Sequence, residues 1–145
     1  GLKLFRYSME NILDYRRDVE EEEKQKFAEI RKEYMQQKEV LDDFEQKLND
    51  AVYSNIHHSR PQVYELKNLQ QYIHYLKEKM EIQRRLVLET EGVMETRRRQ
   101  MISAHKDRRM MEKHKEKARY QFDMELEQVE QKINDELALY SHMRK

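Results

Sequence analysis

The feature that most constrains the fold of this chain is an unbroken periodic stripe between residues 66 and 122. Its members recur at alternating intervals of three and four residues: Leu66, Leu69, Ile73, Leu76, Met80, Gln83, Val87, Thr90, Met94, Arg97, Met101, Ala104, Arg108, Met111, Lys115, Ala118 and Phe122. Intervals that average 3.5 residues keep one side of an α-helix against a partner helix in a left-handed coiled coil. A helix of this type does not catalyse by itself, so the functional question is what it contacts.

Composition favours long helices over a compact fold. The 145 residues would suffice for one ordinary domain, but 40% are charged, 37% are hydrophobic, and there are only two glycines and one proline. Compact folds need clusters of turn residues, and the single plausible cluster here spans residues 53–61. Low hydrophobicity is also typical of disordered chains, but the sustained stripe argues against disorder.

A second periodic segment, from about residue 4 to about residue 56, precedes this turn. Its regular members are Phe27, Ile30, Tyr34, Gln37, Leu41, Phe44, Leu48 and Ala51. Upstream, the four glutamates at 20–23 interrupt the apolar pattern, and the eight-residue step from Val19 to Phe27 predicts a local slip in register.

Pro61 is the strongest boundary in the chain, because proline fits the first turn of a helix and lacks an N–H donor. It predicts a turn at about 57–61, capped at Ser59 or Arg60, and a second helix over about 61–143. Gly92 is a lone interior glycine that costs about 1 kcal/mol relative to alanine without ending a helix.

The short connection predicts an all-α, antiparallel coiled-coil hairpin that forms a single domain over residues 1–145. Charge favours the same topology. Residues 1–56 hold 10 Lys and Arg against 14 Asp and Glu, a net charge of −4. Residues 84–119 hold 12 basic against 6 acidic residues, a net charge of +6, and the hairpin lays them along the acidic first half of the chain.

The second helix is predicted to be longer than its partner, which reaches it only to about residue 115. The C-terminal part is therefore expected to overhang, and it carries an apolar stripe whose register shifts by one after Phe122. The members of this stripe are Phe122, Leu126, Val129, Ile133, Leu137 and Tyr140. An apolar stripe without an internal partner is a candidate docking surface.

Several classes of chemistry are disfavoured. The six histidines have neither cysteines nor an HExxH pattern beside them, so no metal site is predicted. With Gly1 and Gly92 as the only glycines, the chain has no phosphate-binding loop, and a two-helix hairpin offers no catalytic pocket. We expect no enzyme activity, no cofactor and no small-molecule substrate. No stretch approaches the ~20 apolar residues of a membrane span, so a soluble cytoplasmic protein is expected.

Basic residues cluster at 97–99, 108–109 and 113–115. Arg97, Arg108 and Lys115 lie on the stripe, where they can pair with acids of the first helix. A solvated and partly neutralised face is the favoured interpretation, and a protein-contacting face is the next. The zero net charge of the chain argues against nucleic acid as a partner.

Aromatic residues gather near the predicted closed end of the hairpin: Phe44, Tyr53, Tyr64, Tyr72 and Tyr75. Tyr72 and Tyr75 flank the stripe beside Leu76, so they are predicted to be only partly covered. Aromatic side chains exposed beside an apolar ridge are typical interface anchors. Simple packing against the first helix is an equal alternative.

Several segments resemble the bacterial flagellar export protein FliJ family. These are Phe5-Arg6-Tyr7, the run Met9-Glu10-Asn11-Ile12-Leu13-Asp14-Tyr15-Arg16, the run Leu69-Gln70-Gln71-Tyr72-Ile73-His74-Tyr75-Leu76, the basic segment 108–117, and the acidic segment 122–139 that follows it. The resemblance covers essentially the whole chain.

The resemblance implies an antiparallel coiled coil similar to the central stalk of rotary ATPases. Its implied partners are the export ATPase hexamer, the membrane export-gate protein and export chaperones, at the inner-membrane export apparatus. Family positions for gate binding match Tyr72 and Leu76, and we add Tyr75 and Phe44. Our candidates for contact with the ATPase ring come from the unpaired stripe: Phe122, Leu126, Val129 and Ile133.

Two alternatives stay open. The related stalk protein of type III secretion injectisomes shares these features. A structural coiled coil that associates with itself through its overhang would also produce them.

Overall fold

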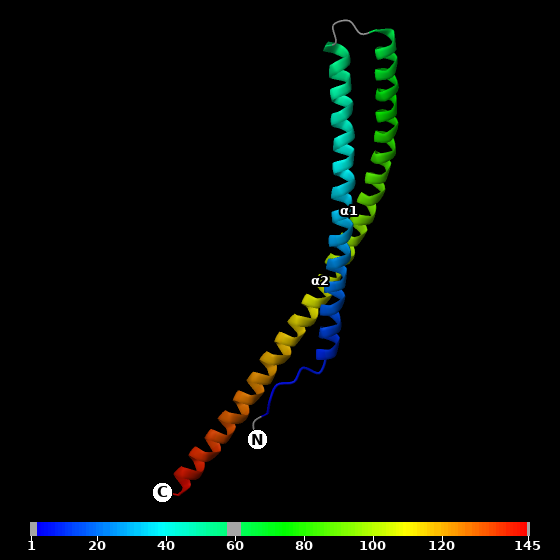
Figure 1. The fold of residues 1–145 in the computed structure, drawn as a ribbon. Coiled ribbons are helices and arrows are strands. Elements are labelled where there is room, and N and C mark those ends of the chain that lie inside the picture. The colour runs from blue at the N-terminus through cyan, green and yellow to red at the C-terminus, as the bar shows by residue number, and fades with distance from the viewer. Residues whose placement is uncertain (1–2, 58–61, 145) are drawn as a thin grey trace. The chain divides into compact units, whose positions relative to one another are not determined.

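The computed structural model describes residues 3–57 and 62–144, with the side chains of residues 55–57 left out of the description. Two helices account for most of them: α1 spans Glu10–His57 and α2 spans Val63–Met143 (Figure 1). No strand occurs in these ranges. The prediction of an all-α chain with two long helices packed against each other is therefore confirmed. The turn is predicted at about 57–61; His57 is the last residue of α1, and residues 58–61, with Ser59, Arg60 and Pro61, lie outside the described residues.

The predicted stripe of α2 matches the pattern of burial along that helix. Every member from Leu66 to Phe122 is buried or half-buried, including the polar members Gln83, Arg97 and Lys115. Helix α2 also runs through Gly92, whose backbone has an ordinary helical sign of φ and open space where a Cβ would stand. The heptad spacing thus identified the inward side of α2 whether or not the residue was apolar.

The predicted register slip in α1 is wrong. Leu13, Arg16, Glu20 and Glu23 are buried or half-buried, and they lead into Phe27 at alternating intervals of three and four residues. Val19, from which the slip is counted, is half-buried beside Glu20 but is not needed to continue this spacing. Leu13 is fully buried and Glu20 is only 3% exposed. The glutamate run does not interrupt the stripe, because two of its four members belong to it.

Helix α1 begins at Glu10 rather than near residue 4. The amide of Glu10 donates to the carbonyl of Tyr7, and the amide of Leu13 donates to the carbonyl of Met9 in the first helical turn. Before this point the chain is not helical. Phe5 and Tyr7 are two positions apart in this non-helical segment, and the rings of both contact side chains of α2.

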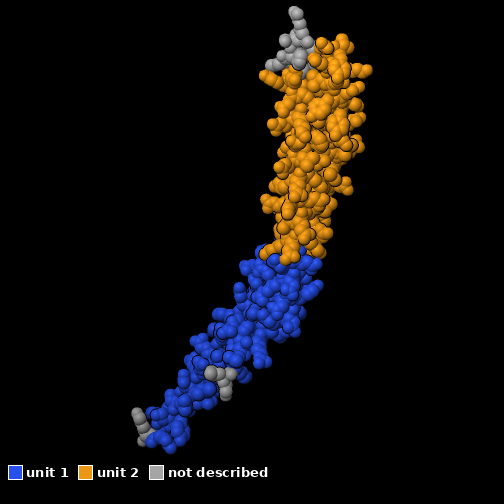
Figure 2. All heavy atoms as spheres, in the orientation of Figure 1, with its two compact units in different colours: residues 1–22, 102–145 blue, residues 23–101 orange. Residues whose placement is uncertain are grey.

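The chain divides into two compact units (Figure 2). Unit 2 comprises residues 23–101, and unit 1 comprises residues 1–22 and 102–145. Each unit contains a part of α1 and a part of α2.

In unit 2 the two helices lie side by side and bury a mainly apolar interface (Figure 1). Its most buried side chains are Ala51, Leu76, Met80, Val87 and Thr90, of which Leu76 is 1% exposed. The amide nitrogen of the Gln83 side chain also donates to the carbonyl of Gln37 across the interface, at 2.8 Å. Burial of large apolar side chains therefore holds this pair of helices together.

In unit 1 apolar burial is confined to a few residues, and ion pairs connect the two helices. Leu13, Ala104 and Tyr7 are buried, while Arg16 pairs with Asp107 at 3.3 Å and Lys115 with Glu10 at 2.8 Å. Residues later in α1 pair with residues earlier in α2, which is the order produced by helices that run in opposite directions.

Candidate protein-interaction surfaces

The predicted gate-binding residues lie in unit 2, and their exposure differs sharply. Tyr72 and Tyr75 are 44% and 50% exposed, whereas Leu76 is 1% exposed and Phe44 is half-buried. The ammonium of Lys79 lies 5.7 Å from the ring centroid of Tyr75, a cation–π contact that orients the ring. A partner on this surface would reach the two tyrosines directly, whereas Leu76 is buried.

The predicted ATPase-binding residues lie on α2 in unit 1. Phe122 and Leu126 are half-buried, and Val129 and Ile133 are 53% and 50% exposed. From residue 127 to residue 144 every described residue is exposed, including the large side chains of Leu137 and Tyr140. The apolar stripe is therefore accessible over most of its length within this unit.

An aromatic N-terminal segment contacts the beginning of that stripe. The ring of Phe5 lies 5.6 Å from the ring of Phe122, and the guanidinium of Arg119 lies 5.1 Å above the ring of Phe5. Tyr7 is buried against α2 and its hydroxyl hydrogen-bonds Nδ1 of His114. The non-helical segment before α1 therefore also packs on α2, and its contacts reach as far as Phe122.

The charged interface of unit 1 is organised around Glu20. Its carboxylate accepts a hydrogen bond from Nε of Arg108, whose Nη1 donates to Glu112 at 2.7 Å. His105 lies 3.6 Å from the same carboxylate. The hydrogen bonds that Arg108 donates to Glu20 and Glu112 raise its pKa above the ordinary value, so the guanidinium stays charged. Arg97, in contrast, donates to Gln100 of its own helix.

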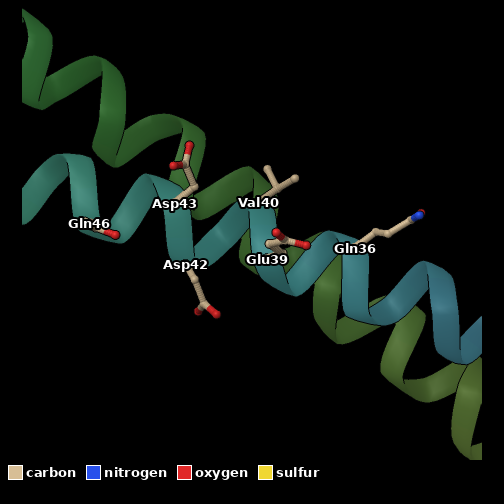
Figure 3. A pocket seen from close by; sticks show the side chains of 6 residues that line it. All are labelled: Gln36, Glu39, Val40, Asp42, Asp43 and Gln46. Carbon is tan, nitrogen blue, oxygen red and sulfur yellow. The ribbon is translucent and has the colours of Figure 1, made fainter.

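The grooves on this molecule are shallow features of helix surfaces. One, in unit 2, is lined by six side chains that all come from α1: Gln36, Glu39, Val40, Asp42, Asp43 and Gln46 (Figure 3). Another, in unit 1, is basic and includes Lys106, Arg109, Lys113 and Lys117 of α2. Both arrangements suit contact with another macromolecule better than enclosure of a small ligand.

The described residues hold neither a metal-ligating cluster nor a membrane-spanning helix. Within residues 3–57 and 62–144, no three His, Cys, Asp or Glu side chains come together in a way that could hold a metal ion. Among the same residues, no helix has the length and apolar character needed to cross a membrane.

Sequence reasoning missed two features of unit 1. It did not pair His114 with Tyr7, and it treated Glu20 as part of an interruption of the apolar pattern rather than as a buried member of the stripe. A signal existed for Glu20, because counting back from Phe27 in steps of four and three reaches Glu23, Glu20, Arg16 and Leu13. The stripe of α1 is continuous in spacing through Glu23, Glu20 and Arg16, but a search for apolar residues does not detect these charged members.

Two long packed helices that display their aromatic and charged side chains along their surfaces define a class of helical interaction proteins. The family described as flagellar FliJ protein matches residues 5–145, and the chain belongs to that family. No curated protein and no solved structure matches the chain. Membership implies a function related to flagellar export, within a family of structural and adaptor proteins rather than a known family of enzymes.

Proposed function

We propose that this protein is a stalk and adaptor of the flagellar type III export apparatus, which links the export ATPase to the export gate and to export chaperones. The match of the FliJ family to residues 5–145 is the observation that carries this proposal. The proposed location is cytoplasmic and peripheral to the inner-membrane apparatus.

The proposed architecture is an antiparallel coiled-coil hairpin in a single domain, with an overhanging C-terminal part of α2. The alternating burial along α1 and α2 and the order of the ion pairs in unit 1 support it. The exposure of residues 127–144 supports the overhang.

The proposed gate-binding surface consists of Tyr72 and Tyr75, with Leu76 and Phe44 supporting them from the interface. Exposed tyrosines anchored beside a buried leucine combine a large apolar area with little loss of side-chain entropy on binding. Loss of Leu76 would therefore affect gate binding through the position of the tyrosines.

The proposed surface for the ATPase ring consists of Leu126, Val129 and Ile133, with Phe122 at its edge. Their helical spacing forms a ridge that can insert among apolar side chains of a ring. Phe5 already contacts Phe122, so a partner would meet mainly the three residues beyond it.

The decisive experiment mixes the purified chain with the purified export ATPase and measures hexamer formation and the rate of ATP hydrolysis. We expect complex formation and a faster hydrolysis rate that saturates with the amount of chain added. Absence of both a complex and stimulation would refute the proposal.

Two other functions remain candidates. The family match to a flagellar protein favours the flagellar apparatus over the injectisome. A purely structural coiled coil that associates through its C-terminal stripe would form oligomers without the ATPase, and sedimentation of the isolated chain with and without the ATPase distinguishes it.

A further inference from the structure

The side of α2 opposite its apolar stripe carries an ordered charge pattern in unit 1. We call it the outer strip, and its members are Lys106, Arg109, Lys113, Lys117, Tyr120, Met124, Glu127, Gln131 and Asp135. Their intervals of three and four residues average 3.6, so they form one line along a straight α-helix. All of them are exposed, and Tyr120 is 67% exposed.

The outer strip is distinct from the proposed ATPase-binding surface. Tyr120 and Val129 are nine residues apart, as are Met124 and Ile133. Nine residues correspond to two and a half helical turns, which places the members of each pair on opposite sides of the helix. This inference therefore stands whether or not the proposed function is correct.

Charge divides the outer strip into two halves around an apolar centre. The half before Tyr120 is basic and includes the residues of the basic groove described above, whereas Glu127 and Asp135 make the half after Met124 acidic. When two copies of such a helix lie antiparallel, the basic half of each strip faces the acidic half of the other, so the two surfaces are complementary in charge.

We propose that the outer strip binds the outer strip of a second copy of this chain, antiparallel and about a two-fold axis near residue 122. In this register Lys117 faces Glu127 of the other copy, Arg109 faces Asp135, and Tyr120 packs on Met124. The two-fold axis repeats each pair, so every contact is made twice.

A second copy fits this surface better than other occupants do. A nucleic acid, an anionic lipid surface or a uniformly acidic protein would attract the basic half but would be repelled by Glu127 and Asp135. A parallel pair of copies would place Lys113 opposite Lys113 and Glu127 opposite Glu127. Only the antiparallel pair satisfies both halves of the strip at once.

The dimer is expected to be weak and sensitive to salt. Its ion pairs are exposed, and exposed pairs contribute little individually and are screened at high ionic strength. The apolar centre is limited to Tyr120 and Met124 of each copy. Association should therefore strengthen at low salt and depend on protein concentration.

Analytical ultracentrifugation of the full chain at low ionic strength tests the proposal. We expect a monomer–dimer equilibrium whose dissociation constant rises roughly tenfold in Lys117→Glu and roughly tenfold in Glu127→Lys, because each reversal introduces two repulsive contacts per dimer. The double variant Lys117→Glu/Glu127→Lys exchanges the charges and should return to within about threefold of the original value.

Matched controls lie on the same helix outside the strip. Glu125→Lys and Lys132→Glu make the same changes of charge at exposed positions of α2 and should leave the dissociation constant unchanged. Because the chain contains no cysteine, Tyr120→Cys and Met124→Cys can test whether the two copies bind in antiparallel orientation. A mixture of these two variants should form disulfide-linked dimers more readily than either variant alone.

Four results would overturn the proposal. A monomer at every concentration and salt condition would do so, as would a dimer indifferent to both single reversals. Loss of the dimer in Val129→Asp/Ile133→Asp, with the outer strip intact, would assign self-association to the apolar stripe. Binding to anionic vesicles that Lys117→Glu abolishes and the double variant does not restore would assign the strip to a membrane surface.

Discussion

The two units join the same helices by different means. In unit 2 the interface consists of apolar side chains such as Leu76, Met80 and Val87. In unit 1 the corresponding side of α1 carries Arg16 and Glu20, and much of the contact consists of ion pairs. The same heptad spacing therefore determines which residues face the partner helix in both units. Those residues are mainly apolar in unit 2, and many of them are charged in unit 1.

This difference has an energetic consequence. Burial of apolar area stabilises a helix pair without a compensating loss of hydration, whereas a buried ion pair must offset the desolvation of both charges. We therefore expect unit 2 to contribute most of the stability. The charges of unit 1 define which residues of the two helices can face one another. Replacing both members of an ion pair by apolar residues of similar volume should leave the stability of the protein nearly unchanged.

The largest expected effect comes from removing a core side chain of unit 2. Leu76→Ala should lower the melting temperature by about 8 °C, because it removes buried methyl groups and leaves a cavity. Thermal unfolding followed by circular dichroism measures this. Leu88→Ala, at a position 66% exposed in the same helix, is the control and should change little. An equal loss in both variants would contradict the apolar interface described for unit 2.

A smaller effect is expected from breaking the ion pair of unit 1. Arg108→Leu leaves the buried carboxylate of Glu20 without its guanidinium partner and should lower the melting temperature by about 5 °C. Arg109→Leu, at a more exposed position of the same helix, serves as the control in the same thermal scan. A melting temperature unchanged in Arg108→Leu would show that Glu20 is solvated rather than buried.

Replacing both partners should have the smallest net effect. In Glu20→Leu/Arg108→Leu no unpaired charge remains, and we expect a melting temperature within about 2 °C of the original protein or above it. Comparison with the single variant Arg108→Leu isolates the cost of removing the guanidinium from the buried carboxylate of Glu20. If the double variant were less stable than the single one, the ion pair itself would be a source of stability in unit 1.

Much of this fold could be predicted from the sequence, because the heptad spacing is a geometric requirement that tolerates polar residues. The stripe of α2 was identified through Gln83, Arg97 and Lys115 on spacing alone. The same spacing includes Glu20 and Glu23, but the four consecutive glutamates are not apolar, and treating them as an interruption of the pattern produces the incorrect register slip. The partner of Glu20 lies 88 residues away at Arg108, beyond the reach of local patterns.

The candidate surfaces were less predictable. Spacing placed Tyr72 and Tyr75 beside the stripe, and both are exposed, but Leu76 belongs to the stripe and is buried. The non-helical segment with Phe5 and Tyr7 is too short for its periodicity to separate it from the start of a helix by sequence alone. Its position depends on contacts with Phe122 and His114, which only the folded chain provides.

The most direct test of this account asks whether the two units serve different partners. The measurement is the rate of ATP hydrolysis by the purified export ATPase in the presence of the intact chain, of Val129→Asp/Ile133→Asp, and of Tyr72→Ala/Tyr75→Ala. We expect stimulation by the intact chain and by the tyrosine variant, and a loss of most of the stimulation in the variant of residues 129 and 133. Equal stimulation by all three proteins, or loss only in the tyrosine variant, would contradict it.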